Sequence, residues 1–315
     1  MNVLIITPHY INRISGGSLA SRAYIGAFAS IYENCTLIYP DDNGINISNY
    51  FPPNIKLLPC YDNRTKIQKG IDLYLGILTR FPKFVKRHLK KNNYDIVVFD
   101  HLLSTIGIIN IINKRQTKII TIHHNVEIDY YKDNLPPIYL RYAILPKIKK
   151  AEYKAIQYSD LNLTITQQDR ESFIARMKAV PSKIFYCGIS ESYSDTSISL
   201  IKQDTINHEV PTFIITGSLC FPQSIESITK FIHIYYPLIK QEFGNFKLLI
   251  CGRDPNKKLI NIVKEMHNIE IIANPINIIN IIKKADVYIC PIESGGGIKL
   301  RIMDGLKCGI PIISK

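Results

Sequence analysis

The chain has 315 residues, of which 46% are hydrophobic and 21% charged, so it is long enough for two domains that each bury a core. Seven scattered cysteines form no C-x-x-C pair, which predicts reduced thiols in a cytosolic protein and argues against a disulfide framework or a structural zinc site. Residues 1–7 lack the basic start and long apolar stretch of a signal peptide, and no run of 18 apolar residues predicts a membrane span.

The formal net charge of +13 lies mostly in the first part of the chain. Residues 1–190 hold 25 of the 39 Lys and Arg residues but only 14 of the 26 Asp and Glu residues. Within Lys66–Lys91, apolar residues alternate with Lys and Arg at helical spacing. Such a helix either packs on the core with a solvated basic face or lies on an anionic membrane surface, and both interpretations stay open. The usual nucleic-acid-binding modules are absent, so no nucleic-acid partner is expected.

The first half of the chain alternates apolar, β-branched runs with amphipathic stretches. Predicted strands are Asn2–Thr7, Cys35–Tyr39, Ile55–Pro59, Asp95–Phe99, Lys118–Ile122, Leu161–Thr166 and Lys183–Tyr186. Predicted helices are Gly17–Ile31, Lys66–Lys91, Leu103–Asn113 and Pro137–Tyr158. This alternation predicts an α/β domain with a doubly wound parallel sheet over residues 1–187.

A polar stretch without periodicity, residues 188–210, predicts a linker. Beyond it, residues 211–315 alternate again and predict a second Rossmann-like domain. Its predicted strands are Thr212–Thr216, Phe246–Cys251, Ile269–Ile272, Asp286–Cys290 and Ile310–Ile313. Its predicted helices are Gln223–Phe243, Asn256–His267, Ile276–Lys284 and Ile298–Lys307. We expect the site in a cleft faced by the carboxyl ends of the strands of both domains.

The most informative segment follows the predicted strand Asp286–Cys290. The triplet Gly295–Gly297 lacks β-carbons, so its backbone can bend sharply and bring N–H groups against a ligand before the next helix begins. Free N–H groups and the helix dipole both favour an anion there, and Lys299 and Arg301 add positive charge. A carboxylate, Asp304, follows one turn later. Phosphates at the loop and sugar hydroxyls at the carboxylate together suggest a nucleotide-sugar site.

This segment resembles the donor-binding signature of the retaining group 1 (family 4) glycosyltransferases of GT-B fold. The matching positions are Gly295–Gly297, Lys299, Arg301, Asp304, Gly309 and Pro311. Other segments resemble the family along the whole chain, including Thr121–Glu127, which is similar to its H-N-V-E box. The family's second domain normally continues past the strand at Pro311, so the resemblance predicts an incomplete, truncated second domain here.

The resemblance implies roles for residues of both domains. Expected catalytic residues are His124, His123, Lys299 and Arg301. Expected donor-binding residues are Gly16, Gly17, Gly217, Ser218, Gly295, Gly296, Gly297, Ile298 and Asp304. Nearby candidates are Asn125, Glu127, Glu293, Asn274 and Pro275, and His9 is a weaker one. Members of this family need no metal, and no D-x-D motif occurs, so we expect neither a metal ion nor a cofactor beyond a UDP- or GDP-linked sugar as substrate.

The leading hypothesis is a hexosyltransferase-type enzyme of bacterial surface polysaccharide synthesis, such as lipopolysaccharide, O-antigen or capsule. It would transfer a sugar, with retention, from a nucleoside diphosphate to a lipid-linked or saccharide acceptor. We expect it in the cytoplasm, peripheral on the inner face of the plasma membrane. One alternative is a truncated, inactive binder of nucleotide sugars or an interaction protein. Another is a sugar-nucleotide 2-epimerase, whose set of acidic residues this chain does not display.

Overall fold

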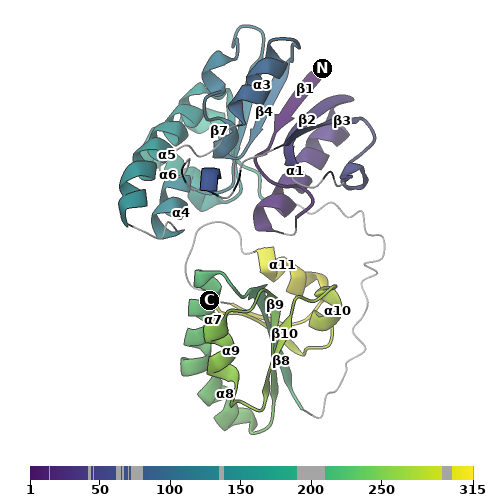
Figure 1. The fold of residues 1–315 in the computed structure, drawn as a ribbon, viewed down its shortest axis with the longest axis vertical. Helices are drawn as coiled ribbons and strands as arrows, with labels where there is room; N and C mark the ends of the chain where they lie inside the picture. The colour runs from purple at the N-terminus through teal and green to yellow at the C-terminus, as the bar shows by residue number, and fades with distance from the viewer. Residues whose placement is uncertain are drawn as a thin grey trace. The chain divides into compact units, whose positions relative to one another are not determined.

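The structure is a computed structural model that describes residues 1–13, 15–41, 44, 46–61, 65, 67–69, 71, 81–134, 138–189, 210–292 and 300–314. These residues form two compact α/β units, residues 1–189 and 210–314, each built around one parallel sheet (Figure 1). The predicted linker, residues 188–210, lies mostly outside the described residues, so its bounds stay a prediction.

The first unit has a seven-stranded sheet in the order β3-β2-β1-β4-β5-β6-β7, and every strand pair is parallel. The strands are β1 Asn2–Ile6, β2 Asn34–Asp41, β3 Ile55–Tyr61, β4 Ile96–Asp100, β5 Lys118–His123, β6 Leu161–Thr164 and β7 Ile184–Tyr186. Because the chain order reverses between β1 and β4, the carboxyl ends of these two strands form the switch point at which such sheets bind ligands. The prediction of a doubly wound parallel sheet is confirmed.

Helices cover both faces of this sheet (Figure 1). They are α1 Gly16–Ile31, α3 Pro82–Leu89, α4 Glu127–Asn134, α5 Ile138–Tyr158 and α6 Gln167–Met177, with short 3₁₀ turns η1 Ser48–Tyr50, η2 Leu102–Ser104, η3 Ile109–Ile111 and η4 Pro181–Lys183. In β4, Ile96 and Val98 pack in the core that includes α1, whereas Val97 and Phe99 pack in the opposite core with α3 and α5. Successive side chains of the strand therefore alternate between two buried layers, which explains its continuous apolar sequence.

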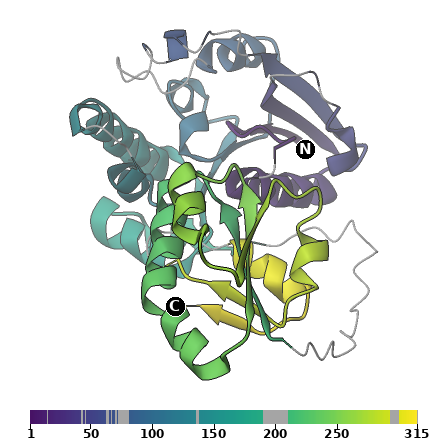
Figure 2. The same ribbon diagram turned by 60° about the horizontal axis from the view of Figure 1, so that its bottom comes forward.

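The second unit has a five-stranded parallel sheet in the order β10-β9-β8-β11-β12. The strands are β8 Thr212–Ser218, β9 Lys247–Arg253, β10 Ile269–Ala273, β11 Val287–Cys290 and β12 Ile312–Ser314. The helices are α7 Pro222–Ile234, α8 Tyr236–Phe243, α9 Lys257–Val263, α10 Ile279–Ile282 and α11 Leu300–Lys307. Figures 1 and 2 show α7, α8 and α9 on one face of this sheet and α10 and α11 on the other, in agreement with two separate cores.

The predicted helix Leu103–Asn113 is wrong, because the structure has the two 3₁₀ turns η2 and η3 there. The Ser104 and Thr105 hydroxyls donate to the carbonyls of residues 101 and 102, at 2.6 and 2.7 Å, and so favour a tight turn. Gly107 then adopts φ +71°, which is incompatible with a continuous right-handed helix.

The predicted helix Gln223–Phe243 is two helices, α7 and α8, that meet at Tyr235. Pro237 lies in the first turn of α8, where its missing N–H is tolerated, and inside one long helix it would break the hydrogen-bond ladder. Two helices of the first unit, α4 and α6, were not predicted at all. Thr166 caps α6 by accepting the N–H of Asp169 at 2.9 Å, a start signal that lay inside the predicted strand Leu161–Thr166.

Residues 66, 70 and 72–80 of the predicted basic helix Lys66–Lys91 lie outside the described residues, and its later part contains α3. Within α3, Val85 is fully buried in the core, and Phe84 and Leu89 pack against that core. Lys83, Lys86 and Arg87 are exposed, as are Lys90 and Lys91 just beyond the helix. The helix α3 therefore packs on the core and exposes a basic face.

All seven cysteines are free thiols. Cys35, Cys251, Cys290 and Cys308 are buried, whereas Cys187 in the first unit and Cys220 in the second are exposed. Among the described residues, no helix is both long and apolar enough to cross a bilayer.

Candidate functional site

Three histidine side chains meet at the switch point of the first sheet. His9 follows β1, His101 follows β4 and His124 follows β5, and parallel strands bring their carboxyl ends to one edge. The ring centroids lie 5.0 Å apart for His9 and His101, 5.2 Å for His9 and His124, and 5.4 Å for His101 and His124. We call these three residues the histidine cluster. His124 was predicted as a site residue and His9 was a weaker candidate, whereas His101 was missed.

Two buried carboxylates pair with the histidine cluster. The Nε2 of His124 lies 2.7 Å from Oδ1 of Asp100, and the Nε2 of His101 lies 2.9 Å from Oε1 of Glu127. Burial alone would raise the pKa of Asp100, but the charge and hydrogen bond of His124 hold that pKa well below its usual range. Burial, reinforced by the charges of His101 and His124, lowers the pKa of His9 well below its ordinary value. The cluster therefore combines a neutral imidazole with two carboxylate-paired ones.

Glu127 is itself held in place at the start of α4. The buried side chain of Glu152 on α5 accepts the N–H of Glu127 at 2.6 Å and the N–H of Ile128 at 3.4 Å. Side-chain oxygens at a helix N-terminus satisfy its free N–H groups. Asn125 donates from Nδ2 to Oε1 of Glu127 at 3.3 Å. The predicted candidates Asn125 and Glu127 thus both lie beside the histidine cluster.

His123, the other predicted catalytic histidine, lies against a different part of the sheet. Its Nε2 is 3.0 Å from Oδ1 of Asn162, and its ring packs 4.8 Å from that of Phe173. Burial lowers the pKa of His123 to about 4, so its ring is neutral at physiological pH. This position is that of a packed core histidine, as the alternation of side chains along β5 requires once His124 faces the cluster.

The predicted glycines Gly16 and Gly17 form the first turn of α1, which Ser15 caps by accepting the N–H of Ser18 at 3.2 Å. A β-carbon on Gly17 would lie 2.5 Å from Cε1 of His9. A glycine at position 17 is therefore needed for the imidazole of His9 to lie on the start of the helix.

In the second unit, Arg301 extends from α11 to the carboxyl end of β8. Its Nη2 donates to Oγ of Ser224 at 3.0 Å, and a β-carbon on Gly217 would lie 2.5 Å from its Nη1. Burial lowers the pKa of Arg301, although the side chain stays a cation because its ordinary pKa is so high. Ser218 ends β8 beside it. The structure thus brings the predicted residues Arg301, Gly217 and Ser218 together at the start of α7.

Three further predicted residues lie at the same edge of the second sheet or on α11. Asn274 and Pro275 follow β10, and Asn274 has φ +50° and accepts the N–H of Asp254 at 2.9 Å. Asp304 is on α11 and contributes to the electrostatics of both Arg301 and Tyr288. The predicted residues Glu293, Gly295, Gly296, Gly297, Ile298 and Lys299 lie outside the described residues.

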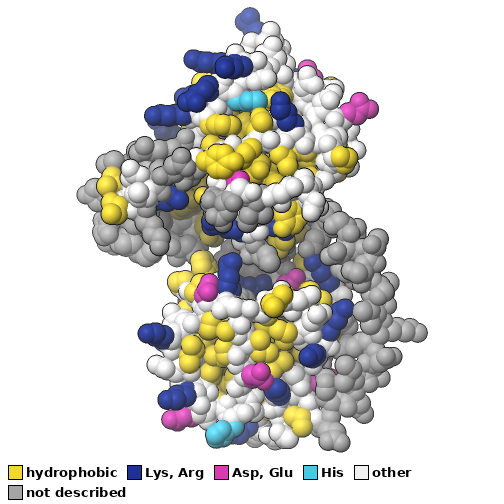
Figure 3. All heavy atoms as spheres, turned by 45° about the vertical axis from the view of Figure 1, so that its right-hand side comes forward, with side chains coloured by type: hydrophobic (Ala, Val, Ile, Leu, Met, Phe, Trp, Pro, Cys, Tyr) yellow, Lys and Arg dark blue, Asp and Glu magenta, His cyan; other side chains and the backbone are white. Residues whose placement is uncertain are grey.

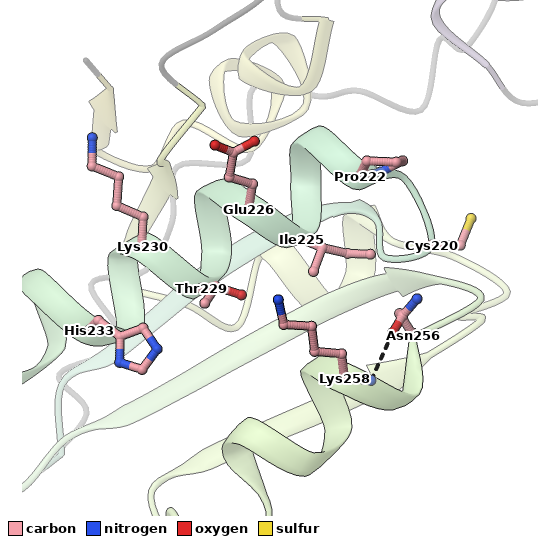
Figure 4. A pocket seen from close by; sticks show the side chains of 9 residues that line it. All are labelled: Cys220, Pro222, Ile225, Glu226, Thr229, Lys230, His233, Asn256 and Lys258. Atoms are coloured by element: carbon pink, nitrogen blue, oxygen red, sulfur yellow. Dashed lines mark hydrogen bonds between the residues drawn. The ribbon is translucent and has the colours of Figure 1, made fainter. Parts of the chain in front are cut away.

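An open groove of about 590 Å³ lies beside α7 and the start of α9. Figure 4 shows its lining residues: Cys220, Pro222, Ile225, Glu226, Thr229, Lys230, His233, Asn256 and Lys258. None of them is a predicted site residue. Among the described residues, no group of three or more His, Cys, Asp or Glu side chains is arranged to hold a metal ion.

Residues 210–315 match the sequence model of the family described as glycosyl transferases group 1. The second unit is a group 1 glycosyltransferase domain. The presence of this domain supports a transferase activity. No curated protein matches the sequence significantly.

Solved structures agree on the architecture of the whole chain. HepE of Anabaena in complex with UDP is similar with a TM-score of 0.66 and 11% identity, over 99% of this chain and 80% of that one. WaaG, a glycosyltransferase involved in lipopolysaccharide biosynthesis, matches with a TM-score of 0.63 and 14% identity, over 98% and 80%. Sucrose-phosphate synthase from Thermosynechococcus elongatus matches with a TM-score of 0.69 and 12% identity, over 99% and 80%. At such low identities these likenesses establish the GT-B fold and nothing finer.

Proposed function

We propose that this group 1 enzyme transfers a sugar from a nucleoside diphosphate to a lipid-linked or saccharide acceptor in the synthesis of a cell-surface polysaccharide. The observation that carries the proposal is the guanidinium of Arg301, which lies against Gly217 at the carboxyl end of β8 in a group 1 domain. When the glycosidic bond breaks, negative charge develops on the leaving diphosphate. A preformed cation at that point stabilises this charge.

The loop that follows β8 contains no Lys or Arg of its own between Gly217 and Ser224. Arg301 supplies a guanidinium to this loop from α11, at the N-terminal end of α7. Two of the similar solved structures hold UDP or UDP-glucose, which makes UDP the first nucleotide to test. Lys299 and the glycine triplet before α11 would complete the diphosphate site, with Asp304 for the ribose hydroxyls.

In the first unit, we assign the histidine cluster to contact with the reacting sugar and the acceptor. His124 is a fixed, carboxylate-paired imidazole at the end of β5, which suits hydrogen bonding to sugar hydroxyls. Retention of anomeric configuration is proposed from the family resemblance. The anomer of the product, measured by proton NMR, tests it directly.

The location that we propose is the cytoplasm, at the inner face of the plasma membrane. The basic face of α3 and the residues after it support this, because clustered Lys and Arg residues attract anionic lipid headgroups. Figure 3 shows Lys and Arg side chains gathered at the upper end of the first unit, where Figure 1 places α3. Two of the similar structures, WaaG and WaaB, are lipopolysaccharide glycosyltransferases, which favours the surface-polysaccharide pathway.

Isothermal titration of the full chain with UDP, GDP and their sugar conjugates, without added metal, tests the proposed function. We expect micromolar binding of one nucleotide and a loss of about ten- to a hundredfold in affinity in Arg301→Ala, the range for removing a charged hydrogen-bond donor. Lys247→Ala is the matched control. Lys247 begins β9, so it lies at the amino-terminal end of the strands, away from Arg301, and its Nζ pairs with Glu270 at 2.6 Å.

Failure of the folded chain to bind any of these nucleotides overturns the proposal. Binding without turnover of any nucleotide sugar, in the presence of saccharide and lipid-linked acceptors, favours the alternative of an inactive nucleotide-sugar binder.

A further inference from the structure

The backbone of His101 adopts a conformation that a residue with a side chain rarely takes. Its φ is +80° and its ψ 147°, a region occupied almost only by glycine. Such strain persists where the surroundings determine the backbone more strongly than local preference does, and it is concentrated at functional sites. His101 is also buried, with 7% of its surface exposed.

Several bonds hold His101 in this conformation. Its N–H donates to the carbonyl of Ile122 on β5 at 3.0 Å, and its Nδ1 accepts the N–H of Leu103 at 3.1 Å. Its Nε2 lies 2.9 Å from Glu127, which Glu152 fixes in turn at the start of α4. Both ring nitrogens are thereby engaged, so the orientation of the imidazole is determined at two points.

The strained backbone changes where this side chain goes. Ile96 and Val98 of β4 face the core that includes α1, so Asp100 faces that side too. Val97 and Phe99 face the opposite core, and a regular strand would send the side chain of residue 101 there. The positive φ instead brings His101 beside the ring of His124, to which Asp100 is bonded.

Two successive side chains of one strand end therefore contact a single imidazole. Asp100 bonds to Nε2 of His124 at 2.7 Å, and the ring of His101 meets that of His124 edge to face at 5.4 Å. We infer that His101 is a positioning residue: its backbone conformation and its bond to Glu127 fix the orientation of His124 against Asp100. This inference rests on the proposed function, in which His124 faces the reacting sugar.

The groups around His124 come from every neighbouring element. They are His9 after β1, Tyr24 on α1, Asp100 and His101 at the end of β4, Glu127 at the start of α4 and, behind it, Glu152 on α5. Of these, only His101 combines a strained backbone with direct contact to the His124 ring.

Nitrogen NMR of the full chain labelled at its histidine rings tests the inference without any substrate. The variants are Glu127→Gln, His101→Ala and His101→Gly, and His124 is assigned from His124→Gln. We expect the ring-nitrogen chemical shifts of His124 to change in each variant, because the contacts that orient its ring change. His233→Ala, an exposed histidine of α7, is the control that leaves the signal unchanged.

The two substitutions at position 101 separate backbone strain from side-chain loss. The glycine variant should melt at a higher temperature than the alanine variant, because glycine adopts this φ and ψ without steric cost. In activity assays both should lose about ten- to a hundredfold in kcat with the donor KM unchanged, since the reacting centre is misplaced and donor binding is not.

An unchanged His124 signal in all three variants overturns the inference, and so does a wild-type kcat in His101→Gly. Absence of transferase activity in the wild-type chain refutes the proposed function instead, while the NMR comparison still decides whether His101 positions His124.

Discussion

The guanidinium of Arg301 occupies the space that a β-carbon at position 217 would need, since such an atom would lie 2.5 Å from Nη1 and 2.8 Å from Cζ. Gly217 is the last residue but one of β8 and Arg301 lies more than eighty residues later on α11, yet the first determines where the second can lie. The glycine requirement at this strand end is thus set by an arginine of the neighbouring helix, whereas the local backbone conformation does not demand it.

Gly217→Ala should weaken nucleotide binding with little effect on stability. The new methyl group displaces the far end of a flexible side chain, so the free energy of unfolding should change by less than about 1 kcal/mol. The affinity for the nucleotide found by titration should fall about tenfold, because the guanidinium leaves its position. Titration of this variant beside Arg301→Ala checks it, and wild-type affinity would show that Arg301 acts from another position.

Gly252→Ala, in contrast, should lower the stability of the second unit strongly. A β-carbon on Gly252 would lie 1.8 Å from the carbonyl oxygen of Gly217, its partner on the adjacent strand, and backbone cannot move aside as a side chain can. We expect a loss of about 3 kcal/mol or more in the stability of the second unit, as in severe overpacking. Urea unfolding followed by circular dichroism measures it, and a loss below about 1 kcal/mol would contradict the close pairing of β8 with β9.

Glu152 should make the stability of the first unit depend on pH. Burial raises the pKa of Glu152 to about 8 from its ordinary value of 4.5, so the folded protein holds this proton more tightly than the unfolded chain. Between these two values the unfolded state loses the proton first, and stability falls as the pH rises, by up to about 1.4 kcal/mol per pH unit.

The measurement is a series of urea unfolding curves between pH 5 and pH 8 for the wild type and Glu152→Gln, which stays neutral and keeps an acceptor oxygen for the N–H of Glu127. The variant should show a flatter dependence on pH over this range. Parallel curves for both proteins would mean that Glu152 is ionised in the folded state.

Reversal of two charges on the basic face of α3 should weaken binding to anionic vesicles. Lys86 and Arg87 are exposed, so Lys86→Glu with Arg87→Glu leaves the buried side of the helix intact. Since each basic residue near an anionic surface contributes about 1 kcal/mol, sedimentation with phosphatidylglycerol vesicles should show at least tenfold weaker binding. Reversal of Lys257 and Lys258 in the second unit is the matched control, and equal effects of both pairs would indicate attraction by net charge alone.

The sequence was sufficient to predict both parallel sheets, because strands buried on two faces are continuous apolar runs with a recognisable length. It was insufficient where a single residue decides the local path. Gly107 and Pro237 each interrupt a stretch whose apolar spacing predicts one continuous helix. They act through a positive φ and a missing N–H, which the spacing of apolar residues does not reveal.

In the candidate site, too, residues that belong to sequence motifs could be predicted, whereas a residue that matters through its backbone conformation could not. His124 and Arg301 were found because they belong to recognisable motifs. His101 was missed because its importance depends on a positive φ, and residue identity gives no sign of that at a histidine. His123 and His124 face opposite sides of β5, and it was the family resemblance, not residue type, that favoured His124 of the two.

Each unit carries one exposed thiol, so a dye can be attached to each unit and the distance between the two dyes measured. Cys220 is exposed in the second unit and Cys187 in the first. Partial burial of the sulfur of Cys187 raises the pKa of its thiol. Maleimide dyes should react with the exposed Cys220 and Cys187, while the four buried cysteines are protected by the cores and Cys60, which is of intermediate exposure, is replaced by serine. Energy transfer between the two dyes would then report whether the distance between the units changes when nucleotide is added.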